Sequence, residues 1–246
     1  MTDSHSGILQ SEADELGIGV LPMPFYIDEK LYREGVDISR EEFYDLLRKG
    51  VDVSTSQPSP EEVMKMWDAM LEQYEELVYI PISSGLSGSC MTAQAMAQDE
   101  PYAGKVFVVD NGRVSTPMHR SVLDAVELAG KGYSAEKIKK ILEDNRENMV
   151  IYVGLSTVSY LKKGGRISSV AAVAADVLNI KPVMKFGVGK LDVYQKCRGI
   201  KNARKAMIDA IKNEFATNFK DAYEAGKVYL MAASSSTAEV TGEWIA

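Results

Sequence analysis

Two stretches of this sequence of 246 residues are rich in hydroxyl side chains and could bind an anion. They are Ser54-Thr55-Ser56-Gln57-Pro58 and Ser83-Ser84-Gly85-Leu86-Ser87-Gly88-Ser89, and each directly precedes a predicted helix. The first N–H groups of a helix have no partner within the helix, and the helix dipole is positive at that end. Hydroxyl donors beside such groups favour a carboxylate or a phosphate, whereas the alternative is that the serines only cap the helices.

The sequence offers no complete catalytic motif. Residues 85–89 narrowly miss the G-x-S-x-G pattern of a nucleophilic serine, because Ser89 stands where the last glycine belongs. A serine hydrolase also needs a histidine base, and His5 and His119 are the only histidines of the chain. Gly187-Val188-Gly189-Lys190 lacks the spacing of a phosphate-binding P-loop. We therefore predict no catalytic residues.

The cysteines and histidines are too few and too scattered for a metal site. Cys90 and Cys197 lie far apart in the sequence, and only two histidines accompany them. Isolated thiols are among the most buried side chains of folded proteins. We therefore expect both cysteines to be buried as small apolar groups, with neither a disulfide nor a bound metal.

Basic residues cluster in the second half of the chain. They lie in Lys162-Lys163-Gly164-Gly165-Arg166 and in Lys196-Cys197-Arg198-Gly199-Ile200-Lys201. Arg166 and Arg198 each adjoin a glycine, which lets the backbone of a binding partner come close. We predict that these two arginines contact an anionic headgroup or an acidic partner. The alternative for the lysines is a solvated helix end, where positive charge complements the helix dipole.

The overall composition is that of a globular protein with an acidic balance. The chain has 46% hydrophobic residues, 28 basic and 35 acidic residues, and a formal net charge of −7. This balance disfavours nucleic acid and anionic membrane surfaces, both of which require a basic footprint. The longest apolar stretch, residues 170–175, is too short to insert stably into a membrane, and no secretory signal is visible. We expect a cytoplasmic protein.

Strands and helices alternate through the first half of the chain, which predicts a doubly wound, mostly parallel α/β sheet. Helices begin at the capping boxes Ser39-Arg40-Glu41-Glu42 and Ser59-Pro60-Glu61-Glu62. The second of these helices has an apolar face at helical spacing. We expect strands at residues 19–27, at the edge of a sheet because of two prolines, and at 77–82, 106–109 and 150–154.

After residue 165 the pattern changes. It predicts a helix at 170–178, a hairpin at 182–196, a long helix at 201–219, a strand at 228–233 and a helix from about residue 238. The hairpin introduces antiparallel strands. We therefore predict two α/β domains, residues 1–155 with the hydroxyl-rich loops and residues 156–246 with the antiparallel elements.

In combination, these motifs resemble the DegV family of fatty-acid-binding proteins. They occur in the order of the family and cover essentially the whole chain. They are Thr2-Asp3-Ser4, Thr55-Ser56-Gln57-Pro58, Ile82-Ser83-Ser84-Gly85-Leu86-Ser87-Gly88-Ser89, Val109-Asp110, Leu161-Lys162-Lys163-Gly164-Gly165-Arg166-Ile167, Asn179-Ile180-Lys181-Pro182 and Arg198-Gly199.

The resemblance implies a two-domain protein that holds a long-chain fatty acid between its domains, without a cofactor or catalysis of its own. By position, Thr55 and Ser87 match the hydroxyls that bind the carboxylate, and the predicted site includes Ser56 and the N–H of Gly88. Proteins of this family present the fatty acid to a partner kinase. Arg166 and Arg198 would then lie in the headgroup or partner-facing region.

The chain ends depart from the family pattern. The family has a strand before Thr2-Asp3-Ser4 and ends with a strand and a loop rich in His and Gly, whereas this sequence ends within a predicted helix at Trp244-Ile245-Ala246. We therefore expect the second domain to be incomplete at its C-terminus. Two alternatives remain open for the function. One is an enzyme or enzyme subunit that binds a small carboxylated or phosphorylated metabolite at the same loops; the other is an interaction module whose arginines dock a protein.

Overall fold

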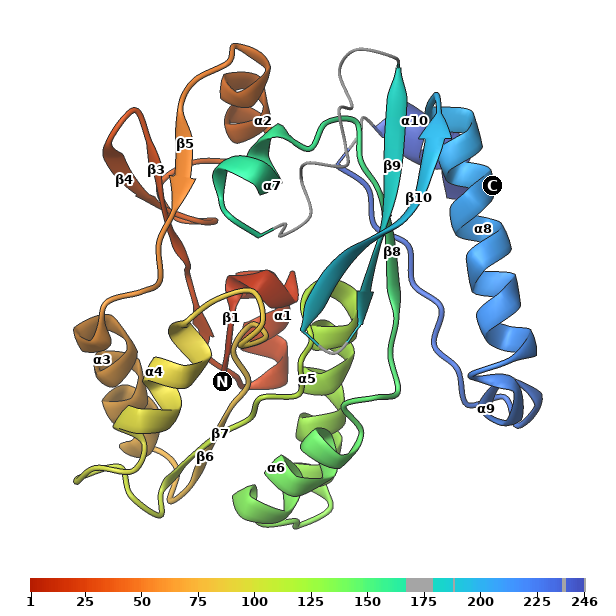
Figure 1. Ribbon diagram of the computed structural model, residues 1–246. Helices are drawn as coiled ribbons and strands as arrows, with labels where there is room; N and C mark the ends of the chain where they lie inside the picture. The colour runs from red at the N-terminus through yellow and green to blue at the C-terminus, as the bar shows by residue number, and fades with distance from the viewer. Residues whose placement is uncertain (167–178, 188, 236–237, 246) are drawn as a thin grey trace.

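The N-terminal part of the computed structural model, which describes residues 1–166, 179–187, 189–235 and 238–245, is built on parallel strands (Figure 1). Their order is β2-β1-β6-β7, because Thr2 pairs with Val20 on one side and bridges to Ile80 on the other. This confirms the predicted parallel layer. The strands are β1 (Thr2–Asp3), β2 (Val20–Leu21), β6 (Leu77–Tyr79) and β7 (Val106–Val108).

Helices cover both faces of this sheet. Neighbouring residues of a strand point to opposite faces, so Tyr79 packs in a cluster around Trp67 while Ile80 packs in a second cluster around Met118. The three layers form the doubly wound arrangement that the sequence predicts. The Trp67 face carries α3 (Pro60–Leu71) and α4 (Ser89–Met96), and the other face carries α1 (Gln10–Leu16), α5 (Ser115–Gly130) and α6 (Ala135–Asp144).

A small antiparallel sheet, β4-β3-β5, stands beyond the parallel sheet (Figure 1). The sequence predicts one strand over residues 19–27, but this is wrong: the chain leaves β2, and the N–H of Met23 donates to Ser4 Oγ before β3 begins. A tight turn at Asp28 and Glu29, both at positive φ, joins β3 to β4. The elements of this region are β3 (Pro24–Ile27), β4 (Lys30–Arg33), α2 (Arg40–Arg48) and β5 (Val53–Thr55).

The C-terminal part contains an antiparallel sheet in the order β8-β9-β10. The predicted hairpin is confirmed, with Gly189 at φ 75° in its turn. One face of the sheet packs on α8, and the other packs on α7. The elements are β8 (Ile151–Gly154), α7 (Ser159–Lys163), β9 (Ile180–Gly187), β10 (Lys190–Arg198), α8 (Ile200–Ala216), α9 (Lys220–Glu224) and α10 (Ala238–Ile245).

Two further expectations differ from the structure. The strand predicted at 150–154 is present as β8, but it pairs antiparallel with β9 instead of joining the parallel layer, because a short apolar strand does not specify its neighbour. Residues 228–233 form no strand: Tyr229 and Leu230 are 70% and 67% exposed, and no strand in the described parts of the chain pairs with them. The predicted helix at 170–178 lies outside the described residues.

Both cysteines are buried, as the sequence predicts, with 0% of Cys90 and 4% of Cys197 exposed. Burial, reinforced by the charge of Asp110, raises the pKa of the Cys90 thiol to about 12. Neither thiol is bonded in a disulfide. Among the helices of the described segments, none has both the length and the apolar character needed to cross a bilayer.

Candidate functional site

The order of the parallel strands marks where a ligand would bind. From β1 the chain crosses to β2 on one side, and from β6 it crosses to β7 on the other. The connections after β1 and β6 therefore diverge, and we call the region beyond the carboxyl ends of these two strands, where open α/β sheets hold ligands, the crevice. The crevice is bordered by the 3-10 turn η1 (Ser4–Ser6) after β1 and by residues 83–89 after β6.

Residues 83–89 form a turn that is hydrogen-bonded to the connection after β7. The N–H groups of Leu86 and Ser87 both donate to the carbonyl of Ser83, at 3.0 and 3.1 Å. Ser84 Oγ donates to Asp110 Oδ2 at 2.6 Å, and the N–H of Ser83 donates to the carbonyl of Arg113 at 2.9 Å. The connection after β7 therefore supports the loop after β6 and fixes its shape.

Ser87 and Gly88 stand at the start of α4. Ser87 Oγ accepts the N–H of Ser89, the first residue of α4, at 3.2 Å, while Gly88 occupies the N-cap position and has no side chain to cap the helix. Because the oxygen accepts that bond, the hydroxyl proton remains available to a ligand. The N–H of Gly88 has no acceptor within the described segments. Both donors can therefore serve an anion at this helix terminus.

The other hydroxyl-rich loop, residues 54–58, lies beside the start of α4 as well. Thr55 ends β5, opposite Phe25, and the hydroxyl of Ser56 donates to the carbonyl of Gln57 at 3.2 Å. The side chain of Gln57 lies against the loop of residues 83–89, because a Cβ added at Gly88 would lie 3.3 Å from Gln57 Oε1. The structure thus brings the segments of Thr55, Ser56, Ser87 and Gly88 together. Thr55 and Ser56 are exposed, and Ser87 is half-buried.

The turn after β1 contributes a buried carboxylate and a histidine that the sequence analysis did not select. Asp3 is fully buried, and its Oδ2 accepts the N–H of Ile82 at 2.8 Å. Its Oδ1 accepts the N–H of His5 at 2.9 Å and lies 3.1 Å from Nδ1 of the imidazole. The available signal for these two residues was their place at the end of a strand, where ligands bind. However, β1 has only two residues, which is too short for a strand to be recognised from its periodicity.

Of the two predicted arginines, only Arg166 reaches the crevice. Arg166 is the third residue after α7; its Nε donates to the carbonyl of Leu86 at 3.2 Å, and its guanidinium also contacts the carbonyl of Gly164. The guanidinium therefore lies beside the loop that carries Ser87. The hairpin of the C-terminal sheet meets this loop as well, because Gly189 packs against Gly85 with no room for a side chain.

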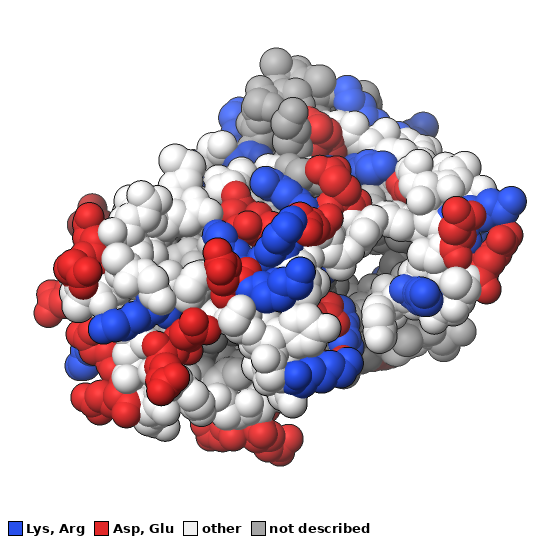
Figure 2. All heavy atoms as spheres, turned by 90° about the horizontal axis from the view of Figure 1, so that it is seen from below, with Lys and Arg blue, Asp and Glu red and all other residues white. Residues whose placement is uncertain are grey.

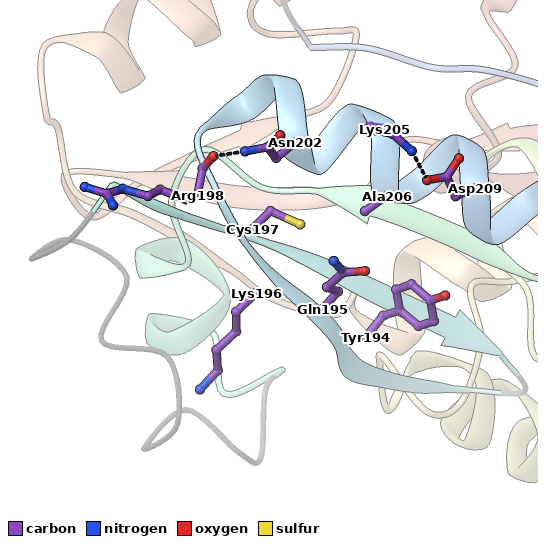
Figure 3. A pocket seen from close by; sticks show the side chains of 9 residues that line it. All are labelled: Tyr194, Gln195, Lys196, Cys197, Arg198, Asn202, Lys205, Ala206 and Asp209. Carbon is purple, nitrogen blue, oxygen red and sulfur yellow. Dashed lines mark hydrogen bonds and ion pairs between the residues drawn. The ribbon is translucent and has the colours of Figure 1, made fainter.

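Arg198 lies elsewhere. It ends β10 and borders a pocket of about 380 Å³ between β10 and α8 (Figure 3). Figure 3 shows its guanidinium turned away from the other lining side chains, while its carbonyl accepts Nδ2 of Asn202 at 2.7 Å. This pocket is polar, and the Lys205–Asp209 ion pair lies along α8 at its border. The structure therefore does not bring Arg198 together with the hydroxyl-rich loops.

The charged side chains give no sign of a metal or of a nucleic-acid surface. Among the residues that the structure describes, no group of three or more His, Cys, Asp or Glu could hold a metal ion. On the face seen in Figure 2, lysines and arginines alternate with acidic residues rather than forming one basic patch. A phosphate backbone would need such a patch.

The parallel sheet thus has polar loops at its switch point, the place where open α/β sheets bind ligands, and the antiparallel sheet lies beside it. The model of the DegV family of uncharacterised proteins matches residues 1–241, and the chain belongs to this family. A DegV domain-containing protein of Caldanaerobacter subterraneus subsp. tengcongensis is 33% identical over 213 residues, which are 87% of this chain and 76% of the relative.

Solved structures of the family are similar to this one. A DegV family protein from Thermus thermophilus, described for its fatty-acid binding, matches at a TM-score of 0.76 and 33% identity, covering 86% of this chain and 75% of its own. DegV from Bacillus subtilis, described as a fatty acid binding protein, matches at a TM-score of 0.75 and 26% identity, covering 87% and 77%. The α/β fold predicted from the sequence is therefore confirmed.

Proposed function

We propose that this protein binds a long-chain fatty acid between two domains, residues 1–155 and 156–246, with the carboxylate in the crevice beyond β1 and β6. The observation that carries the proposal is the meeting of two hydroxyl-rich loops at one helix terminus, in a family whose solved members include fatty-acid-binding proteins. The headgroup ligands are the hydroxyls of Thr55, Ser56 and Ser87 and the N–H of Gly88. Arg166 adds a positive charge beside them.

Hydrogen-bond energies support this set of donors. Moving a carboxylate out of water costs several kcal/mol unless hydrogen bonds replace its hydration. Each hydrogen bond to a charged group contributes about 1.5–3 kcal/mol. Two or three hydroxyls and one helix-terminal N–H therefore suffice to offset the cost.

The acyl chain has an apolar surface beside the loops. In the antiparallel sheet Met184 pairs with Val153 on one side and Val193 on the other, so the three side chains share one face. Leu155, Leu161 and Leu191 belong to the same cluster and are only partly buried. This face lies opposite α8, and the hairpin between β9 and β10 brings it to Gly85. About 15 methylenes at about 0.8 kcal/mol each would make the tail the main source of affinity.

The protein acts as a carrier rather than as a catalyst, in this proposal. It has no cofactor, it works in the cytoplasm, and it presents the fatty acid to a kinase that transfers the phosphoryl group. Arg198 supports the partner role, because it is exposed and, in Figure 3, turned away from the other side chains that line its pocket. An exposed arginine beside a glycine suits an acidic or phosphorylated surface.

The proposal is tested by palmitate binding to a Thr55→Val/Ser87→Ala double variant, measured by titration calorimetry at neutral pH. Loss of two hydrogen bonds to a carboxylate should weaken binding by about tenfold or more for each hydroxyl. Thr217→Val is the matched control, because Thr217 is exposed at the end of α8 and its hydroxyl donates to Asn213. Circular dichroism checks that each variant is folded.

The outcomes separate the candidate functions. Equal affinity in the double variant and the control would reject the headgroup assignment. A wild-type protein that ignores palmitate but binds a short carboxylated or phosphorylated metabolite would instead favour the enzyme alternative at the same loops.

A further inference from the structure

The 3-10 turn η1 places His5 just beyond the carboxyl end of β1, an inner strand of the parallel sheet. The turn spans Ser4–Ser6, and Asp3 caps it by accepting the N–H of His5. Asp3 also accepts the N–H of Ile82, the residue before the loop with Ser87. On the other side, Ser4 Oγ accepts the N–H of Met23, at the start of the connection to β3. The turn that carries His5 is therefore joined both to the residue before the loop of residues 83–89 and to the connection that leads to β3.

The imidazole of His5 is oriented by Asp3 and partly exposed. Asp3 Oδ1 lies 3.1 Å from Nδ1, and about a third of the side chain is exposed (34%), whereas Asp3 is fully buried. No partner for Nε2 is found among the described residues. A ring that is fixed through one nitrogen presents the other to a ligand.

The charges around His5 favour its positive form. Burial acts to lower the pKa of His5, as does the charge of Arg166, but the hydrogen bond and charge of Asp3 and the charge of Glu34 outweigh them and raise it. Glu34 is held by Ser4 Oγ at 2.6 Å.

The helix that packs against the turn adds no competing free charge. On α5, His119 Nε2 lies 2.8 Å from a carboxylate oxygen of Glu12. The guanidinium of Arg120 is bonded to Asp124, also on α5. The charges that act on His5 are therefore those of Asp3, Glu34 and Arg166.

We infer that His5 is a headgroup-binding residue, which as an imidazolium donates from Nε2 to the fatty-acid carboxylate and makes fatty-acid affinity depend on pH. Arg166 and His5 then face the same anion from opposite sides of the crevice, one from the C-terminal part and one from β1. The inference rests on the proposed function and adds to it a regulation of the same site. Affinity is greatest when His5 is protonated and falls as the pH rises through the pKa of His5 in the complex.

The test compares palmitate affinity from about pH 6 to about pH 9 in the wild type, His5→Asn and His119→Asn. Asparagine at position 5 keeps an amide donor toward Asp3, and His119 supplies the control because it is the other histidine of the chain. If the carboxylate raises the pKa of His5 by about one further unit, wild-type affinity falls about tenfold across this range. His119→Asn should follow the wild type, whereas His5→Asn should be nearly flat.

The carboxyl group of palmitate can itself gain or lose a proton, so a neutral ligand is the control that separates its titration from that of His5. Hexadecanol, which has the same chain length and no charge, should bind wild type and His5→Asn with the same weak dependence on pH. Equal pH profiles for palmitate in the wild type and in His5→Asn would overturn the role of His5 and leave fatty-acid binding in place. Absence of palmitate binding by the wild type at every pH would overturn the proposed function, and the role of His5 with it.

Discussion

The contact between Gly85 and Gly189 offers a sharp test of how the C-terminal hairpin positions the hydroxyl-rich loop. A Cβ at Gly85 would lie 2.6 Å from both the Cα and the carbonyl carbon of Gly189, and closer still to its carbonyl oxygen. Carbon atoms meet at about 3.5 Å, so the hairpin or the loop must move by about 1 Å in Gly85→Ala. The obstacle is backbone, which cannot rotate aside as a side chain can.

Two measurable consequences follow from that displacement. Overpacking of this kind costs about 1–3 kcal/mol, so the free energy of unfolding in urea should fall by that amount. A shift of about 1 Å also takes the donors beside Ser87 out of hydrogen-bond range of the carboxylate, and palmitate affinity should fall by about tenfold or more.

Gly187→Ala is the matched control for this variant. Gly187 lies in the same hairpin, but a Cβ there meets no atom within 4 Å. It should keep wild-type stability and affinity. If Gly85→Ala behaved like Gly187→Ala in both assays, the close approach of the hairpin to the loop would be wrong, and with it the contact that joins the two parts of the site.

Two further predictions concern the packing and the charges of the fold. Trp67 is fully buried, with its ring 5.0 Å from that of Tyr102 and 6.0 Å from that of Tyr79, so Trp67→Ala should lower the free energy of unfolding in urea by about 3–5 kcal/mol; a loss below 1 kcal/mol would mean that this core is not formed. Burial alone would raise the pKa of Glu214, but hydrogen bonds, above all from Lys185, outweigh it and lower the pKa. Its stabilising contribution is therefore present above the ordinary value of 4.5 and is lost as the pH falls below it. The stability difference between wild type and Glu214→Gln should be largest near neutral pH and shrink in acid, whereas a difference that does not change with pH would contradict the assignment.

The fold of the N-terminal part was largely predictable because its signals are local. The capping box at Ser59 is present, with Ser59 Oγ accepting the N–H of Glu62 and the Glu62 carboxylate accepting the N–H of Ser59. The apolar face behind it buries Val63 and Trp67. Such signals act over one or two helical turns, so the sequence alone is sufficient to place them.

The pairing of strands could not be predicted in the same way. Residues 151–154 are apolar and short, and nothing within them says whether the neighbour is β7 or β9. Residues 228–233 have the composition of a strand, yet strands need a partner whose position depends on the rest of the chain. The predicted strand over 19–27 failed because Met23 is held by Ser4, a contact across 19 residues.

The residues of the candidate site also differ in whether a local signal or a long-range contact places them. Ser87 and Gly88 were found because a hydroxyl-rich loop before a helix is a local signal. His5 was not selected, since its place depends on β1 lying at the centre of the sheet, which follows from the pairing of Thr2 with Val20 and Ile80. Arg166 and Arg198 read alike in sequence but lie in different places, because only the tertiary structure brings Arg166 to Leu86.

The most direct test of fatty-acid binding is mass spectrometry of an organic extract of the purified protein, together with native mass spectrometry of the intact chain. We predict one long-chain fatty acid per chain in the wild type and its loss from the Thr55→Val/Ser87→Ala variant. A wild-type protein that is purified empty and takes up no added palmitate would contradict the account.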